Sequence, residues 1–153
     1  MDKKLLSSLQ KTCAGSEHCS SQVRMKILRK TNGDTAAADE ILEALIKDGY
    51  VDDNRYAAAF VRDKSALQAW GPVKIKFALK SKGLSDGVID KAMAEIDKDK
   101  SDEKMLRLLS SRAAALEGDP QIRLKLLKYI LSRGFDYSAA EEMMKEVKYR
   151  QGN

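Results

Sequence analysis

The chain has 153 residues, of which 43% are hydrophobic and 33% are charged, and its formal net charge is +5. This balance can support a packed core and excludes disorder as a description of the whole chain. No apolar run approaches the roughly 18 residues of a membrane span, the charged N-terminal segment lacks the apolar stretch of a signal peptide, and two cysteines are too few for a disulfide scaffold, which together favour a cytoplasmic location.

Along the chain, apolar residues recur at the helical period, and no segment sustains the alternation of a strand. A first short helix is expected to end near Gly15. The later helices are expected to have N-caps at Ser20 or Ser21, Asp34 or Thr35, Asp52, Ser85, Ser101 and Asp136, or to begin at a proline, as at Pro72 and Pro120. Several should end at glycines that adopt the left-handed conformation without steric cost, namely Gly33, Gly49, Gly83 and Gly134. The helix from Asp52 is expected to run toward Ala69, and the all-charged stretch 97–100 is the expected flexible joint.

The helices before Gly33, Gly83 and Gly134 are basic and contain no acidic residue. These glycines are 50 and 51 residues apart, so the same charge recurs at one place in a repeating unit. The segment after each of them is acidic instead. The basic residues expected to form a binding surface are Arg24, Lys26, Arg29, Lys30, Lys74, Lys76, Lys80, Lys82, Arg123, Lys125, Lys128 and Arg133.

The helix 72–82 carries two apolar pairs at a spacing of four residues, Val73 with Phe77 and Ile75 with Leu79. The two pairs lie on different sides of the helix, with lysines on the ridge between them. This helix is therefore expected to pack against neighbours on both flanks and to present charge outward.

These patterns predict an all-α protein built as an elongated array of three tandem three-helix, helix-turn-helix-like repeats, over residues 1–48, 49–99 and 100–153. Equivalent helices of such an array fall along one side, so the basic helices would form a continuous track. Positive charge spread in this way suits the phosphates of a nucleic acid, and it suits an acidic groove of a protein equally well.

The chain resembles the RecX family, the regulators of the RecA recombinase. The resemblance is carried by an ordered series of segments: Gly49-Tyr50-Val51-Asp52-Asp53-Asn54-Arg55-Tyr56-Ala57, Phe60-Val61-Arg62, Trp70-Gly71, Lys74-Ile75, Leu79-Lys80-Ser81-Lys82-Gly83 and Ile89. It is strongest over residues 39–98 and extends over 16–149. Upstream, Ser16-Glu17-His18-Cys19-Ser20 and Lys26-Ile27-Leu28 are also similar to the family, and the third repeat matches mainly in pattern. The first repeat departs from the others, because Gly33 lacks the apolar neighbour that Leu84 and Phe135 provide after Gly83 and Gly134.

The resemblance implies three tandem three-helix repeats and binding to RecA and to RecA–DNA filaments. It also implies inhibition of strand exchange and ATP hydrolysis, a role in homologous recombination, DNA repair and the SOS response, and no catalytic activity of the chain itself. Arg55 and Arg62 lie in the segments that carry the resemblance and join the candidate binding residues. Arg55 is either such a contact or an ion-pair partner on the helix face.

Other kinds of site find little support in the sequence. Cys13, His18 and Cys19 are the only metal-like cluster, and no fourth cysteine or histidine completes a structural zinc site. Neither phosphate-binding glycine loop occurs, which argues against a nucleotide-hydrolysing enzyme. We therefore expect no metal, no cofactor and no catalytic residue. Asp52 is better explained as a helix cap than as a catalytic carboxylate.

Three functions remain open. The first, favoured by the resemblance, is a regulator that occupies the groove of the recombinase filament. The second is a direct binder of single- or double-stranded DNA, since three-helix units with a basic member can act as helix-turn-helix modules. The third is a helical scaffold for another protein. No contact with a membrane is expected, and the chain is expected to be a monomer.

Overall fold

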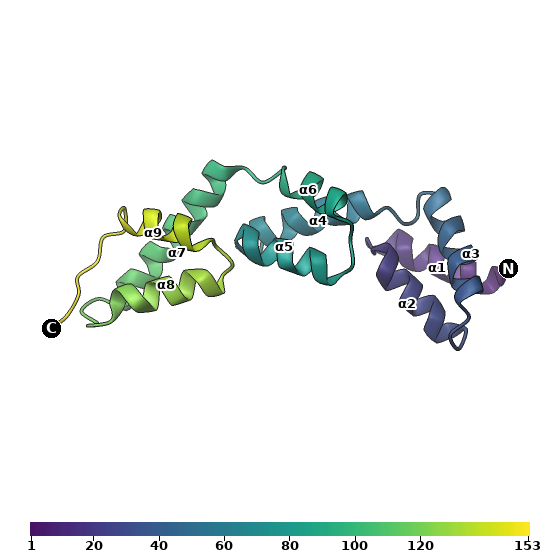
Figure 1. Cartoon of the computed structure of the whole chain (residues 1–153), viewed down its shortest axis with the longest axis horizontal. Coiled ribbons are helices and arrows are strands. Elements are labelled where there is room, and N and C mark those ends of the chain that lie inside the picture. Colours follow the sequence, from purple (N-terminus) through teal and green to yellow (C-terminus); the bar gives the residue numbers. More distant parts are fainter. The chain divides into compact units, whose positions relative to one another are not determined.

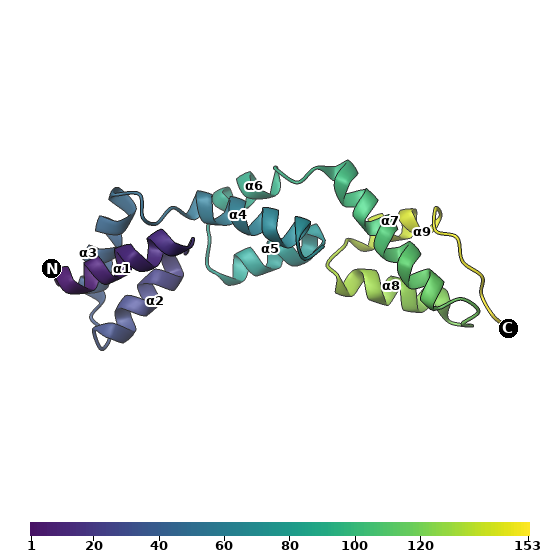
Figure 2. The same cartoon turned by 180° about the vertical axis from the view of Figure 1, so that it is seen from behind.

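A computed structural model describes all residues from Met1 to Asn153, and it contains nine α-helices and no strand (Figures 1 and 2). The helices are α1 (Lys3–Gly15), α2 (Ser20–Lys30), α3 (Thr35–Lys47), α4 (Asp53–Ala66), α5 (Pro72–Ser81), α6 (Asp86–Met93), α7 (Lys98–Ala115), α8 (Ile122–Ser132) and α9 (Tyr137–Met144). The prediction of an all-α fold is confirmed. None of these helices is both long enough and apolar enough to cross a membrane.

The helices follow one another in groups of three, and the first and third groups each have a core of their own. In the first group, α3 packs against α1 and α2; in the third, α7, α8 and α9 pack against one another. The largest fully buried side chains of these two cores are Leu9, Ile27, Ile41, Leu45, Met105, Leu109, Ile122, Leu126 and Ile130. The middle group, α4 to α6, buries Tyr56, Ala57, Val61, Ile75, Leu79, Ile89 and Ala92.

The chain forms two compact units, and the middle group contributes to both. The first unit comprises Met1–Phe60 and Leu79–Ala92, and the second comprises Val61–Ala78 and Met93–Asn153. Helices α4 and α5 therefore each have one end in one unit and the other end in the other unit. The repeat boundaries expected after residues 48 and 99 stay a prediction.

Four of the expected N-caps are confirmed. Each of these side chains accepts a hydrogen bond from the backbone N–H three residues further on, at donor–acceptor distances of 3.0 to 3.3 Å. They are Asp34, Asp52, Ser85 and Asp136. The N–H groups of the first turn have no partner within the helix, and an oxygen on a short side chain just before the helix can accept from them. Caps of this kind can therefore be predicted from neighbouring residues in the sequence.

At two other helices the N-cap differs from the prediction. Cys19, and not Ser20 or Ser21, is the N-cap of α2, and its N–H donates to the side chain of Gln22 at 3.2 Å. Helix α7 begins earlier than expected, at Lys98.

The carboxylate of Asp97 caps α7, so the expectation of a cap at Ser101 is wrong. It accepts hydrogen bonds from the N–H groups of Asp99 and Lys100, at 2.9 and 3.2 Å. The stretch 97–100 is consequently the cap and first turn of the longest helix and not a flexible joint. A carboxylate at this place is also favoured by the helix dipole.

Two helices are shorter than predicted. Helix α4 ends at Ala66, and Ala69 beyond it has a left-handed backbone with φ +52°. Helix α8 begins at Ile122 and not at Pro120, because the Asp119 carboxylate accepts from the N–H of Gln121 at 2.8 Å and forms a turn ahead of the helix.

The recurring glycines all have positive φ, as expected, but they do not mark the same turn. Gly83 and Gly134, with φ +75° and +95°, donate their N–H groups to the carbonyl three residues back. Gly33, with φ +86°, donates to the carbonyl five residues back, and Asn32 before it is left-handed too, with φ +54°. The first basic helix therefore ends in a wider turn than the other two.

Candidate functional site

Helix α5 buries only one of its two apolar pairs. Ile75 and Leu79 have no exposed surface, whereas Val73 and Phe77 are 54% and 72% exposed. The prediction that both flanks of this helix are covered is therefore wrong for the pair Val73/Phe77. A large aromatic side chain consequently lies on the surface of a basic helix that contains no acidic residue.

The two central lysines of α5, Lys76 and Lys80, are also exposed and make no ion pair. Both lie on the outward side of the helix, because the buried residues Ile75 and Leu79 fix its inward side. Their charge is thus available to a partner.

The outer lysines of this segment are placed over aromatic rings. The Nζ of Lys74 lies 4.4 Å from the centre of the Trp70 ring, and that of Lys82 lies 5.5 and 5.9 Å from the rings of Phe60 and Tyr56. Such contacts attract an ammonium group electrostatically. Lys74 and Lys82 are therefore partly engaged within the chain.

Helix α2 gives part of its charge to its own repeat. Arg24 donates to the carboxylate of Asp39 in α3 at 3.1 Å, and Lys26 is half-buried. Arg29 and Lys30 at the end of the helix are exposed and make no ion pair. This helix therefore presents less available charge than its sequence suggests.

Helix α8 also has basic residues that pair with acids of its own repeat. Arg123 pairs with Glu141 of α9 at 2.6 Å, and Lys125 pairs with Asp119 at 2.5 Å. Only Lys128 is exposed without an ion pair.

The carboxylates of these pairs are held in the charged form. A hydrogen bond from the Tyr137 hydroxyl, followed in size by one from Arg123, lowers the pKa of Glu141. The hydrogen bond from Lys125, followed by that from the N–H of Gln121, lowers the pKa of Asp119. Both carboxylates are therefore ionised at neutral pH.

Within the second unit, the C-terminal end of α8 is joined to the start of α5. The N–H of Gly71 donates to the carbonyl of Arg133 at 2.7 Å, and that of Val73 donates to the carbonyl of Gly134 at 2.9 Å. The guanidinium of Arg133 donates to the carbonyl of Ala69 at 3.4 Å and to that of the residue before it. Arg133 therefore serves this joint.

The joint requires glycine at two positions. A Cβ on Gly71 would overlap the carbonyl group of Gly134, and a Cβ on Gly134 would overlap Lys74. The positive φ of Gly134 adds a second reason against any other residue. This glycine therefore both ends α8 and allows the close approach to α5.

Within the first unit, a second joint links α2 to the residues after α5 and to the start of α4. The Ser21 hydroxyl donates to the carbonyl of Lys82 at 2.5 Å. The carboxylate of Asp53 accepts from the N–H and the hydroxyl of Ser20, at 2.7 and 2.6 Å. Asp53 thus binds the N-terminus of a helix more than thirty residues away in sequence, which a local capping pattern does not predict.

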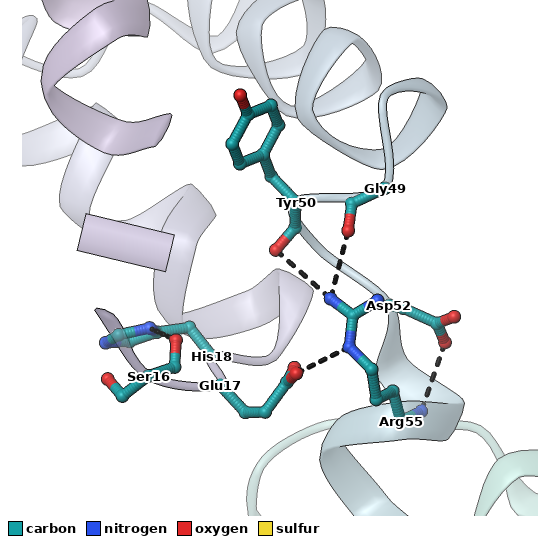
Figure 3. A network of polar contacts seen from close by, with 7 residues as sticks. All are labelled: Ser16, Glu17, His18, Gly49, Tyr50, Asp52 and Arg55. Atoms are coloured by element: carbon teal, nitrogen blue, oxygen red, sulfur yellow. Dashed lines mark hydrogen bonds and ion pairs between the residues drawn. The ribbon is translucent and has the colours of Figure 1, made fainter. Parts of the chain in front are cut away.

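Arg55 forms a network between the loop before α2 and the loop before α4 (Figure 3). Its Nε donates to Glu17 at 2.5 Å, and its Nη2 donates to the carbonyls of Gly49 and Tyr50 at 3.0 and 3.5 Å. The hydrogen bond to Glu17 is the main cause that raises the pKa of Arg55. Of the two roles expected for Arg55, the ion pair is present, and its partner lies outside the helix.

Arg62 faces Glu95 at 3.9 Å, and the two side chains are 64% and 52% exposed. A long pair on the surface contributes little to stability. Arg62 therefore remains a candidate contact residue.

The metal-like residues near the N-terminus have other contacts. The Nδ1 of His18 lies 2.9 Å from the carbonyl oxygen of Ser16 (Figure 3), to which it can donate. Cys13 and Cys19 are buried free thiols, and burial is the main cause that raises the pKa of Cys13. No group of three or more His, Cys, Asp or Glu side chains gathers where it could hold a metal ion.

The fold and this surface define a class of protein: a chain of three-helix repeats whose middle helices carry basic residues. Two solved structures share the fold. One is a crystal structure of RecX from Lactobacillus salivarius, with a TM-score of 0.82, 22% identity and coverage of 95% of both chains. The other is a crystal structure of a regulatory protein RecX, with a TM-score of 0.80, 22% identity and coverage of 94% of this chain and 71% of the other.

Sequence comparison gives the family. The model of the second three-helix domain of RecX matches residues 52–93. Proteins named regulatory protein RecX are similar over most of the chain. That of Clostridium acetobutylicum is 30% identical over 132 residues, and that of Clostridium botulinum (strain Alaska E43) is 34% identical over 130 residues. That of Chlorobium phaeobacteroides is 29% identical over 147 residues. This chain belongs to the RecX family. The matches cover 82% of it and 60% of the two clostridial proteins, and 95% of both it and the Chlorobium protein.

Proposed function

We propose that this protein is a non-enzymatic cytoplasmic regulator that binds a RecA-type recombinase and its DNA filament. Its basic helices occupy the groove of the filament, and this occupation inhibits strand exchange and ATP hydrolysis by the recombinase. The protein acts as a monomer. Membership of a family whose members are named regulatory proteins supports the regulatory part of this proposal.

The observation that carries the proposal is the unpaired charge of the middle helices. Lys76, Lys80 and Lys128 are exposed and have no carboxylate partner in the chain, and Arg29 and Lys30 share these properties. A nucleoprotein filament offers phosphates and acidic protein surface together, and either can take up such charges. These residues are therefore the first choice for contact, ahead of those that already have ion pairs.

We further propose that the basic residues with partners inside the chain make less direct contact with the filament. Arg55 and Arg133 hydrogen-bond to backbone carbonyls at the joints, and Arg24, Arg123 and Lys125 pair with acids of their own repeats. Their contribution to binding would be indirect, through the positions of the helices.

A titration tests the proposal. Purified recombinase hydrolyses ATP on single-stranded DNA while increasing amounts of this protein are added. We expect hydrolysis to fall as the protein approaches the concentration of the recombinase. Unchanged hydrolysis at equal concentrations of the two proteins would contradict the proposal.

A further inference from the structure

Phe77 is the most exposed aromatic side chain of the chain, at 72%, followed by Tyr137 at 56%. It lies in the middle of α5, one residue after Lys76 and three residues before Lys80. An exposed phenyl ring normally lowers solubility, so its place in a strongly basic helix is informative. Val73, one turn earlier, extends the same apolar strip.

The charged residues of α5 are all basic. No acidic residue occurs in the helix, and neither Lys76 nor Lys80 has an ion-pair partner. In α2 and α8, by contrast, at least one basic residue is neutralised by an acid. The three helices have similar charge in the sequence. In the structure, α5 combines lysines that have no ion-pair partner with an exposed aromatic ring.

We propose that the exposed face of α5 binds single-stranded nucleic acid, with an unpaired base stacked on Phe77 and the adjoining phosphates on Lys76 and Lys80. The two lysines are four residues apart, which separates them by about 6 Å along the helix, a spacing suited to neighbouring phosphates. Aromatic rings beside lysines bind single strands in this way, because every base has a face that can stack. The inference rests on the DNA contact within the proposed function and not on the contact with the recombinase.

A single strand fits this face better than a duplex, because the bases of a duplex are already stacked on one another and cannot reach a side chain on a helix surface. The joint to α8 holds the first turn of α5 in place through the hydrogen bonds of Gly71 and Val73. The platform is therefore positioned before the strand arrives, which reduces the entropic cost of binding.

Fluorescence anisotropy with two labelled oligonucleotides tests this inference without any recombinase. One is a 30-mer oligothymidylate, and the other is an abasic strand of the same length and charge. We expect the wild-type protein to bind the oligothymidylate about tenfold more tightly than the abasic strand. Phe77→Ala should remove this preference and leave affinity for the abasic strand unchanged, whereas Phe77→Trp should keep the preference.

Two further variants separate stacking from charge and from general loss of apolar surface. Lys76→Gln with Lys80→Gln should weaken binding of both strands and reduce the slope of log K against log salt by about 1.4. Leu67→Ala is the matched control, because Leu67 is 80% exposed and lies outside the helices. It should bind both strands as the wild type does.

The inference is overturned if Phe77→Ala keeps the preference for bases, or if it weakens both strands equally. It is also overturned if the variant binds oligothymidylate normally but no longer affects the recombinase, since the ring would then contact protein. Base-dependent binding combined with unchanged ATP hydrolysis would support this inference and contradict the recombinase part of the proposed function.

Discussion

Gly71 and Gly134 are two positions at which one added methyl group would disturb the joint between α8 and α5. A Cβ on Gly71 would overlap the backbone of Gly134 at the joint between α8 and α5. Because the obstacle is backbone, it cannot move aside as a flexible side chain can. We expect Gly71→Ala to lower the free energy of unfolding by about 2 kcal/mol or more, measured by urea denaturation followed by circular dichroism.

Two other glycines provide the control for this change. Gly15 and Gly87 lie in helices, and an added Cβ would meet no atom within 4 Å. Alanine at either position should be neutral or stabilising by about 0.5 kcal/mol, because alanine is the better helix former. Equal stability of Gly71→Ala and Gly87→Ala would contradict the close approach described for the joint.

Replacing Arg55 tests whether its polar network stabilises the fold. Arg55→Ala removes the ion pair with Glu17 and the hydrogen bonds to the carbonyls of Gly49 and Tyr50. We expect a loss of about 1 kcal/mol in the free energy of unfolding, since the pair is only partly shielded from solvent. Arg62→Ala, which removes only the long exposed pair with Glu95, should change stability by less than about 0.5 kcal/mol. The reverse order of the two effects would rule out a structural role for the Arg55 network.

At the scale of the helices, Asp53 tests whether one repeat helps to fix another. Its carboxylate belongs to α4 and accepts hydrogen bonds from the N–H and the hydroxyl of Ser20, the first residue of α2. We expect Asp53→Ala to cost about 1 kcal/mol in thermal or urea unfolding, as for the loss of a local cap. Asp90→Ala, at an exposed position of α6, is the matched control and should be close to neutral. If both variants unfold like the wild type, the contact between Asp53 and Ser20 does not stabilise the first unit.

The helices and several of their caps could be predicted from sequence because the interactions that define them are local. Asp34, Asp52, Ser85 and Asp136 each lie three residues from the N–H group that they cap, and this spacing is visible in the chain itself. Asp97 was missed because a charged stretch is typical of both an exposed joint and a first helical turn.

Contacts between distant segments could not be predicted in the same way. The bond from Ser21 to the carbonyl of Lys82, and the bond from Gly71 to that of Arg133, join residues about sixty positions apart. The exposed state of Phe77 was also misjudged, because the four-residue spacing of Val73 and Phe77 is the same for a buried pair and an exposed one. The sequence of a basic helix also does not show which acidic residues of a neighbouring helix pair with it. Asp39 pairs with Arg24 in this way, and Glu141 pairs with Arg123.

At the scale of the whole molecule, the net charge of +5 indicates little about where a partner binds. The positions of the basic residues that have no ion-pair partner in the chain are more informative. In the function proposed above, the exposed lysines of the middle helices bind the partner, and the paired arginines stabilise the internal structure. We therefore predict that replacing exposed lysines of the middle helices weakens inhibition more than replacing the same number of exposed lysines elsewhere in the chain.

The most direct test measures inhibition of recombinase ATP hydrolysis on single-stranded DNA by two variants of equal charge. The first replaces Lys76, Lys80 and Lys128 with glutamine, and the second replaces Lys3, Lys4 and Lys91, which are exposed on α1 and α6. Both should remain folded, because exposed charges contribute little to stability. We predict that the first variant loses most of its inhibition at concentrations where the wild type and the second variant inhibit fully. Equal inhibition by the two variants would contradict the assignment of binding to the middle helices.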